Sequence, residues 1–106
     1  IYKYVMENFV NKISLDEVAD IAYMTPPAFC KYFKNRTIKT FSNFVNEIRI
    51  GYACELLLQG NSDISSIAYL SGFNNFTSFN KNFKKFTKVT PSEFRIKSLS
   101  SLEFSE

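Results

Sequence analysis

Two similar segments lie about 50 residues apart in this chain, and this repetition constrains the fold more than any other feature. Each segment has a short apolar pattern followed by phenylalanines interspersed with lysines. The apolar positions repeat at an offset of 49 residues and the later ones at an offset of 50: Leu15, Val18 and Ala19 match Ile64, Ile67 and Ala68, and Phe29, Lys31, Phe33 and Lys34 match Phe79, Lys81, Phe83 and Lys84. The chain is therefore predicted to contain two copies of one structural unit.

Each copy has the pattern of two short helices separated by a tight connection. Apolar residues at i, i+3 and i+4 predict the first helix, and Phe at i and i+4 predicts the second. A short helix, a turn and a second helix form a helix-turn-helix, whose second helix can enter the major groove of DNA.

Several helix starts are marked by capping residues. Ser14 followed by Glu17, and Thr90 followed by Glu93, have the spacing of a capping box. Thr25 precedes two prolines and also has the character of an N-cap. No segment alternates with period two for long enough to predict a strand, so the predicted fold class is all-α, with two homeodomain-like units. Seven helices are predicted, at residues 1–9, 15–22, 26–36, 41–59, 64–71, 76–86 and 91–97.

The longest predicted helix, residues 41–59, has a broad apolar surface that can contact a helical bundle at each end. Its length of roughly 28 Å is similar to the roughly 34 Å between successive major grooves on one face of DNA. Such a helix either holds two reading helices at groove spacing or simply joins two bundles. The predicted organisation is a first helix-turn-helix subdomain (1–40), a linker helix (41–59), a second subdomain (60–97) and a frayed C-terminal tail (98–106).

Positive charge is concentrated in the second half of each copy, although the whole chain has a net charge of only +3. Residues 26–50 contain five basic residues and one acidic residue, and residues 75–97 contain six and one. The rest of the chain has a net charge of −6. A solvated basic face explains any single lysine, but charge at matching places in both copies indicates an anionic partner such as nucleic acid.

The composition argues against a metal site, a cofactor site and a catalytic centre. The chain has no histidine, and Cys30 and Cys54 do not form a C-x-x-C pair, so the usual zinc ligands are missing. An enzymatic role for Cys30, as a nucleophile or alkyl acceptor, would lack the usual acid–base partner. We therefore expect no enzyme activity, metal or cofactor.

The ends and the hydropathy of the chain suggest where it works. A membrane-spanning helix needs about 18 uninterrupted apolar residues, and no segment approaches this length. The N-terminal residues do not resemble a signal peptide. This predicts a soluble intracellular protein with no membrane partner. The chain begins at Ile1, already inside an amphipathic pattern, and is expected to be part of a longer protein.

The order and spacing of these residues resemble the DNA-binding domain of AraC/XylS-type bacterial transcription regulators over about residues 1–97. The residues that carry the resemblance in the first half are Ser14, Leu15, Val18, Ala19, Phe29, Phe33, Lys34, Phe41, Arg49, Ala53 and Leu57. Those in the second half are Ile67, Ala68, Gly72, Phe73, Phe79, Phe83, Lys84, Lys85, Thr90, Pro91, Phe94 and Arg95.

The resemblance implies sequence-specific binding of double-stranded DNA, with helices 26–36 and 76–86 in successive major grooves. By position, it implies that the base-facing residues are Pro27, Cys30, Lys31, Phe76, Thr77, Asn80 and Lys81. It implies that the residues near phosphates are Lys34, Thr40, Lys84 and Lys85, together with the start of the last helix at 90–92. For Phe76, packing at the helix start is the alternative to a base contact.

The resemblance also implies partners and a location. The partners are RNA polymerase and an N-terminal sensing or dimerisation domain that is not part of this sequence, and the location is the nucleoid of the bacterial cytoplasm.

The chain departs from the family pattern in its turns. Tyr23, Ile38 and Lys88 stand where glycine is common, whereas Gly72 is retained. A residue other than glycine at positive φ costs roughly 1 kcal/mol, so these turns are either rebuilt or strained. The side chains of Pro27 and Cys30 are poorly suited to hydrogen bonding with base edges. This suggests that the second unit carries more of the base specificity.

An alternative function is a helical protein–protein interaction module with an aromatic docking surface. The chain has 12 phenylalanines, and some must face solvent if the core cannot hold them all. A contiguous exposed patch of Phe and Tyr away from the basic helices would favour this function, whereas burial of the phenylalanines in two bundles would not.

Overall fold

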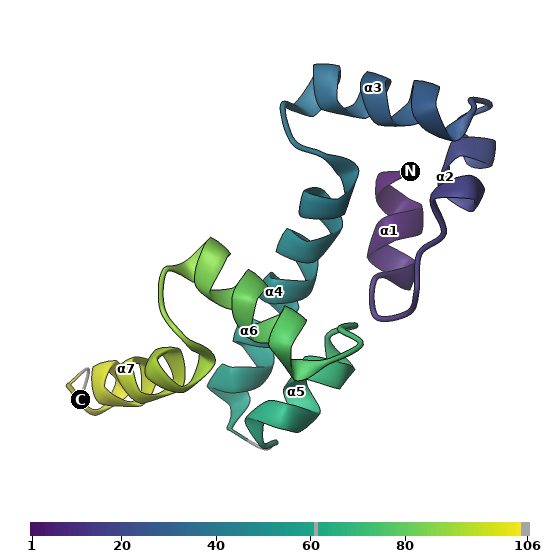
Figure 1. The fold of residues 1–106 in the computed structure, drawn as a ribbon. Helices are drawn as coiled ribbons and strands as arrows, with labels where there is room; N and C mark the ends of the chain where they lie inside the picture. The colour runs from purple at the N-terminus through teal and green to yellow at the C-terminus, as the bar shows by residue number, and fades with distance from the viewer. Residues whose placement is uncertain (61, 105–106) are drawn as a thin grey trace.

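The computed structural model describes residues 1–60 and 62–104, with side chains to residue 98, and these residues form seven helices and no strand. The prediction of an all-α fold with seven helices is therefore confirmed (Figure 1). The helices are α1 (Tyr2–Asn8), α2 (Leu15–Ile21), α3 (Pro26–Thr37), α4 (Phe41–Gln59), α5 (Ile64–Leu70), α6 (Phe76–Thr87) and α7 (Pro91–Phe104).

The predicted bounds are correct to about one residue except at the last helix. Helix α7 continues to Phe104, so the prediction of a frayed tail from residue 98 is wrong over residues 98–104. The tail contains neither glycine nor proline, and nothing in it therefore interrupts the helical hydrogen bonds. Residues 105–106 lie outside the described residues.

The predicted N-caps at Ser14, Thr25 and Thr90 form, but the carboxylate of the first predicted capping box bonds to another helix. Ser14 Oγ accepts a hydrogen bond from the Glu17 amide at 3.5 Å, whereas the Glu17 carboxylate accepts from the Tyr4 hydroxyl at 2.5 Å. That hydrogen bond raises the pKa of Tyr4. The Glu17 side chain thus connects α2 to α1 and does not accept a hydrogen bond from the backbone amide of its N-cap, Ser14.

Three further N-caps were not predicted from the sequence, and they are formed by Thr40, Asp63 and Asn75. Asp63 accepts from the Ser66 amide at 2.9 Å, and Asn75 accepts from the Ser78 amide at 2.7 Å. Hydrogen bonds from Ser66 lower the pKa of the Asp63 carboxyl. Asn75 places the start of α6, the second predicted reading helix, one residue after the cap.

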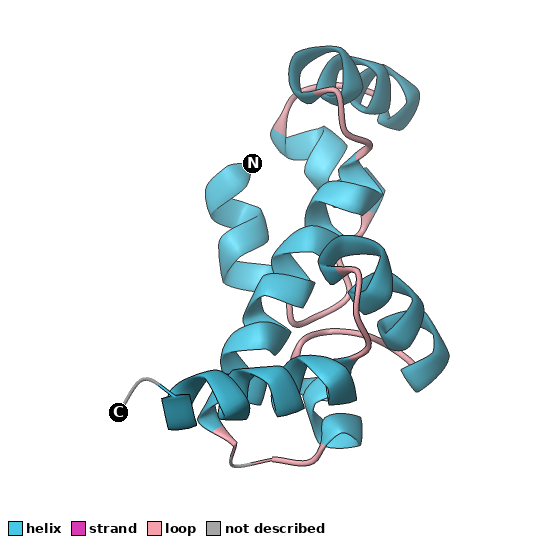
Figure 2. Ribbon diagram, turned by 90° about the vertical axis from the view of Figure 1, so that its left-hand side faces the viewer, coloured by secondary structure: helices cyan, strands magenta, loops and turns pink. Residues whose placement is uncertain are grey.

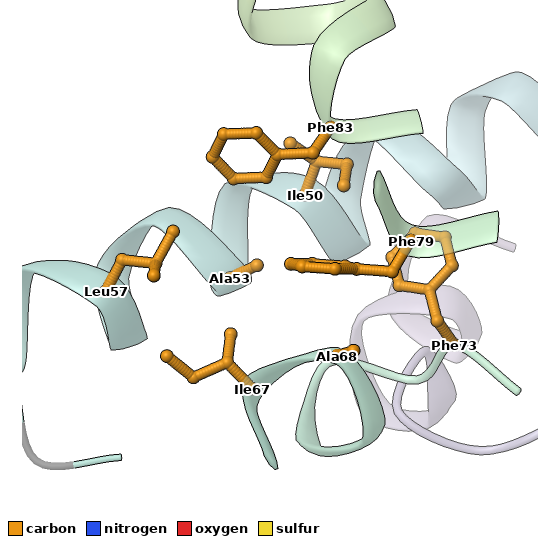
Figure 3. Close-up of a cluster of buried hydrophobic side chains, with 8 residues drawn as sticks. All are labelled: Ile50, Ala53, Leu57, Ile67, Ala68, Phe73, Phe79 and Phe83. Atoms are coloured by element: carbon orange, nitrogen blue, oxygen red, sulfur yellow. The ribbon is translucent and has the colours of Figure 1, made fainter. Parts of the chain in front are cut away.

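The structure has two separate hydrophobic cores that share α4. The first core joins α1, α2 and α3 to the first half of α4, and its buried residues are Val5, Val18, Ala19, Phe29, Phe33, Phe41 and Val45. The second core lies between the second half of α4 and α5–α6, and Figure 3 shows its side chains converging: Ile50, Ala53, Leu57, Ile67, Ala68, Phe73, Phe79 and Phe83. The molecule is accordingly elongated, with extents of 51 × 24 × 23 Å.

The turns between the two helices of each unit have the same backbone hydrogen bonds. In the first turn the Met24 amide donates to the Ala19 carbonyl at 2.9 Å, and in the second the Phe73 amide donates to the Ala68 carbonyl at 3.1 Å. The duplication inferred from sequence is therefore a duplication of helix-turn-helix geometry.

The turns that lack glycine keep the left-handed conformation. The φ angles of Tyr23, Ile38 and Lys88 are 60°, 69° and 71°, so the turns are strained and not rebuilt. Threonine hydroxyls support the two turns that follow the reading helices. Thr37 Oγ1 donates to the Phe33 carbonyl at 2.8 Å, and Thr87 Oγ1 donates to the Phe83 carbonyl at 2.8 Å.

Phe79 provides a test of the second core. Its side chain is fully buried, whereas Phe76, three residues earlier on the same helix, is 43% exposed. We expect Phe79→Ala to lower the free energy of unfolding by about 3–5 kcal/mol, because it leaves a cavity. Phe76→Ala is expected to cost about 1 kcal/mol or less. Urea titrations followed by circular dichroism measure both, and equal losses would contradict the burial of Phe79.

Candidate nucleic-acid interface

The two predicted reading helices lie on one side of the molecule. Each packs against α4, with α3 at one end of the molecule and α6 nearer the other (Figure 1). In Figure 2 both lie on the right-hand side of the view, and α1 lies on the left. A single duplex can therefore approach both helices from the same direction.

The outward faces of α3 and α6 carry the predicted site residues other than Thr40, which precedes α4. Phe29, Phe33, Phe79 and Phe83 turn inward and are buried. The residues that turn outward and are exposed are Pro27, Cys30, Lys31, Lys34, Thr40, Phe76, Thr77, Lys81, Lys84 and Lys85. Asn80 is half-buried, because it lies beside the buried Phe79 on the helix.

In the first unit, three predicted site residues line one surface cavity between α3 and α4. Cys30, Lys34 and Thr40 contribute to this cavity of about 450 Å³. Thr40 is also the N-cap of α4, since its Oγ1 accepts from the Asn43 amide at 3.2 Å. Sequence reasoning gave Thr40 a phosphate contact and missed this capping role.

Lys85 connects the second reading helix to the first unit. Its Nζ donates to Asn43 Oδ1 at 2.9 Å and lies 5.4 Å from the centroid of the Phe86 ring. Asn43 was not identified from the sequence, because its role depends on the approach of α6 to the start of α4. Asn43 therefore bonds both to Lys85, through its side-chain oxygen, and to Thr40, through its backbone amide.

Phe76 packs against the core and also remains accessible. Its ring centroid is 6.0 Å from that of Phe79, while its side chain is exposed at the start of α6 next to Thr77. The packing interpretation is therefore correct for one side of the ring, and the other side is available to a ligand.

The lysines on the reading helices carry charge that the described residues do not neutralise. Among these residues the only ion pair joins Lys39 to Glu47, at 2.6 Å. Two of the basic residues counted in the sequence have structural roles instead. Arg49 Nε donates to the Phe9 carbonyl at 2.7 Å, and Arg95 Nη2 donates to the Ser62 carbonyl at 2.8 Å. The lysines of α3 and α6 therefore supply most of the exposed positive charge on these two helices, together with Arg36.

The burial of the phenylalanines does not favour an aromatic docking surface. Phe29, Phe33, Phe41, Phe73, Phe79 and Phe83 are buried, and Phe9, Phe44, Phe86 and Phe94 are half-buried. Phe76 is the exposed one among the phenylalanines whose side chains are described, and it lies on the basic face. The phenylalanines thus supply the two cores.

Metal-binding and membrane-spanning features are absent from the described residues. They contain no group of three or more His, Cys, Asp or Glu side chains that could hold a metal ion. In the same part of the chain, no helix combines the length and apolar character required to cross a bilayer.

Comparison with known families agrees with this geometry. A family model described as a helix-turn-helix domain matches residues 18–97, which include both turns and both reading helices. The chain belongs to the AraC/XylS-type helix-turn-helix family of transcription regulators.

Known relatives and solved structures show the same likeness. An uncharacterised helix-turn-helix-type transcriptional regulator of Pseudoalteromonas carrageenovora is 37% identical over 92 residues, or 87% of this chain and 54% of that protein. The chain thus spans about half the length of this relative. The C-terminal domain of AraT, a response regulator from Geobacillus stearothermophilus, has a TM-score of 0.81 and 27% identity over 90% of this chain and 79% of its own.

A third likeness concerns the fold alone. The DNA-binding domain of AdpA, a global transcriptional factor whose structure contains a target DNA, has a TM-score of 0.86 at 18% identity. The alignment covers 94% of this chain and 90% of that domain.

The two cysteines provide a chemical test of which face of α3 is accessible. Cys30 is exposed on α3, whereas Cys54 is half-buried on α4 and burial raises its pKa. We expect Cys30 to react with a maleimide at pH 7.5 roughly tenfold faster than Cys54, because burial restricts access to Cys54 and raises its pKa. Mass spectrometry of a time course, with Cys30→Ser as the control, measures both rates. Equal rates would contradict the placement of Cys30.

Proposed function

We propose that this chain binds double-stranded DNA in a sequence-specific manner, as the DNA-binding region of a bacterial transcription regulator. One observation carries the proposal: two helix-turn-helix units with the same turn geometry place α3 and α6 on one side of the molecule, and these two helices carry lysines that form no ion pair among the described residues. A helix fits the major groove of B-DNA, and lysines neutralise the phosphates on either side of it. The structure of the AdpA domain in complex with a target DNA supports this use of the fold.

Within this proposal the two reading helices divide the contacts between bases and backbone. Pro27, Cys30 and Lys31 of α3, and Phe76, Thr77, Asn80 and Lys81 of α6, face base edges. Lys31 and Lys81 can donate to guanine O6 or N7, and Asn80 can pair with an adenine edge. Lys34, Thr40, Lys84, Lys85 and the start of α7 at 90–92 contact phosphates. Because Pro27 and Cys30 offer weak hydrogen bonding, α6 carries more of the base specificity.

The organisation and partners of the whole protein are also part of the proposal. The first subdomain comprises residues 1–40, the linker helix 41–59 and the second subdomain 60–97. Since the relatives are longer than this chain, an N-terminal sensing or dimerisation domain precedes it in the full-length regulator. That regulator contacts RNA polymerase in the cytoplasm, on the nucleoid, and its DNA-binding region has no catalytic role.

The proposal predicts a strong dependence of DNA affinity on salt. If the three lysines assigned to phosphates, Lys34, Lys84 and Lys85, each displace a counterion, log Kd should rise with log salt concentration with a slope of about 3, so that affinity falls about 40-fold between 50 and 200 mM salt. Selection of binding sites from random duplexes, followed by fluorescence anisotropy at several salt concentrations, measures both site and slope. An affinity that does not change with salt would overturn the proposal.

Lys81 and Lys84 are one turn apart on α6 and provide a matched pair of variants. We expect Lys81→Ala to lower the preference for the selected duplex over a scrambled one by about 5- to 100-fold, because it removes a base contact. Lys84→Ala should weaken binding to both duplexes equally and reduce the salt slope by about one unit. If both variants lose affinity equally on both duplexes, the division between base reader and phosphate anchor is wrong.

A further inference from the structure

One side chain near the middle of α4 contacts both helix-turn-helix units. The Arg49 guanidinium donates to the Phe9 carbonyl at 2.7 Å and to the Asn11 carbonyl at 3.0 Å, both in the segment that joins α1 to α2. The central carbon of the Arg49 guanidinium lies 5.9 Å from the centroid of the Phe73 ring, which belongs to the second core. Arg49 is half-buried, and this burial lowers its pKa. It therefore fills the junction between the two units.

The turn of the second unit closes onto the same junction. A Cβ atom on Gly72 would lie 2.5 Å from the Phe9 carbonyl oxygen, 2.9 Å from Arg49 Nε and 3.1 Å from Val10 Cα. The corresponding position in the first unit is Tyr23, which has a similar left-handed turn but is 97% exposed. Glycine is thus required at position 72 for two reasons. The first unit approaches too closely to leave room for a Cβ atom, and the φ angle of 104° is one that other residues rarely adopt.

Helix α4 alone is a weak explanation for a fixed orientation of the two units. Gly51 lies in its interior, and a Cβ atom added there would meet nothing within 4 Å, so close packing does not require glycine at this position. Glycine inside a helix lowers local helix stability. The contacts of the junction lie on either side of this residue. Arg49 precedes it, and Tyr52 follows it with its ring 5.4 Å from that of Phe9 in an edge-to-face arrangement.

The geometry points to Arg49 and Gly72 as positioning residues that set the spacing between the two DNA segments contacted by α3 and α6. We define the junction as Phe9, Asn11, Arg49, Tyr52 and Gly72. This inference rests on the proposed function, since it concerns how two reading helices engage one duplex. Neither Arg49 nor Gly72 needs to touch DNA for this role.

The consequence for recognition follows from the linkage of two binding units. Two linked units gain about 10²- to 10⁴-fold in affinity when their geometry matches both sites, and they lose this gain when it does not. A rigid junction accepts one spacing of the two DNA segments. A loosened junction accepts several, each with a smaller gain, so the optimal duplex is bound more weakly and altered duplexes are penalised less.

The first experiment measures the orientation of the units without DNA. Residual dipolar couplings from NMR should fit one alignment tensor across both units of the wild-type protein and should require two tensors in Arg49→Gln. Arg95→Gln is a matched control, because Arg95 also donates to two carbonyls, those of Leu57 and Ser62, but within the second unit. The control should retain one tensor. Two tensors in the wild-type protein would overturn the inference, whether or not the variants fold.

The second experiment measures spacing tolerance on DNA. The probes are the duplex selected by the wild-type protein and derivatives with one or two base pairs inserted between the two contacted segments. We expect one inserted base pair to weaken wild-type and Arg95→Gln binding by about 100-fold or more, and Arg49→Gln binding by about tenfold or less. Gly72→Ala, which crowds the Phe9 carbonyl from the other unit, should reproduce the Arg49→Gln result.

The outcomes separate this inference from the proposed function. If the wild-type protein binds no duplex, the proposed function fails and the role in DNA spacing falls with it, even where the couplings show one rigid body. If the wild-type protein binds DNA but all variants share its spacing tolerance, the proposed function stands and the positioning role is overturned. Reduced discrimination between spacings in both junction variants, and not in Arg95→Gln, supports the inference.

Discussion

Burial of apolar side chains on α4 is the constraint on which the rest of the structure depends. Each unit contributes two short helices and a turn, which are too few to enclose a core alone. The first half of α4 supplies Phe41 and Val45 to one core, and the second half supplies Ile50, Ala53 and Leu57 to the other. One helix closes both cores. A reading helix that moved relative to α4 would therefore expose the buried phenylalanines of its own unit.

The duplicated units are alike in local geometry and different in their surroundings. Both turns use the same backbone hydrogen bonds, and both reading helices end in a left-handed residue supported by a threonine hydroxyl. Yet Tyr23 projects into solvent, whereas Gly72 meets the carbonyl of Phe9. The second unit is thus packed against the first at its turn, and this makes the pair asymmetric despite its repeated sequence.

Much of the fold and part of the site could be predicted because their signals are local. Caps at Ser14, Thr25 and Thr90 marked helix starts, and the spacing of Phe29 and Phe33 showed which face of α3 is buried. Local signals were misleading where partners compete. The Glu17 carboxylate accepts a hydrogen bond from Tyr4 and not from its own N-cap residue. The serine-rich residues 98–104 lack a helix breaker and remain helical, although their composition suggested a tail.

Periodicity, capping and charge placement were enough to predict two helix-turn-helix units with basic reading helices, because each of these signals acts over a few residues along one helix. The common side occupied by α3 and α6, the bond between Lys85 and Asn43, and the junction at Arg49 were decided by packing. These contacts join residues that are about 40 positions apart in the sequence. They depend on the packing of both cores on α4, so no local pattern in the chain specifies them.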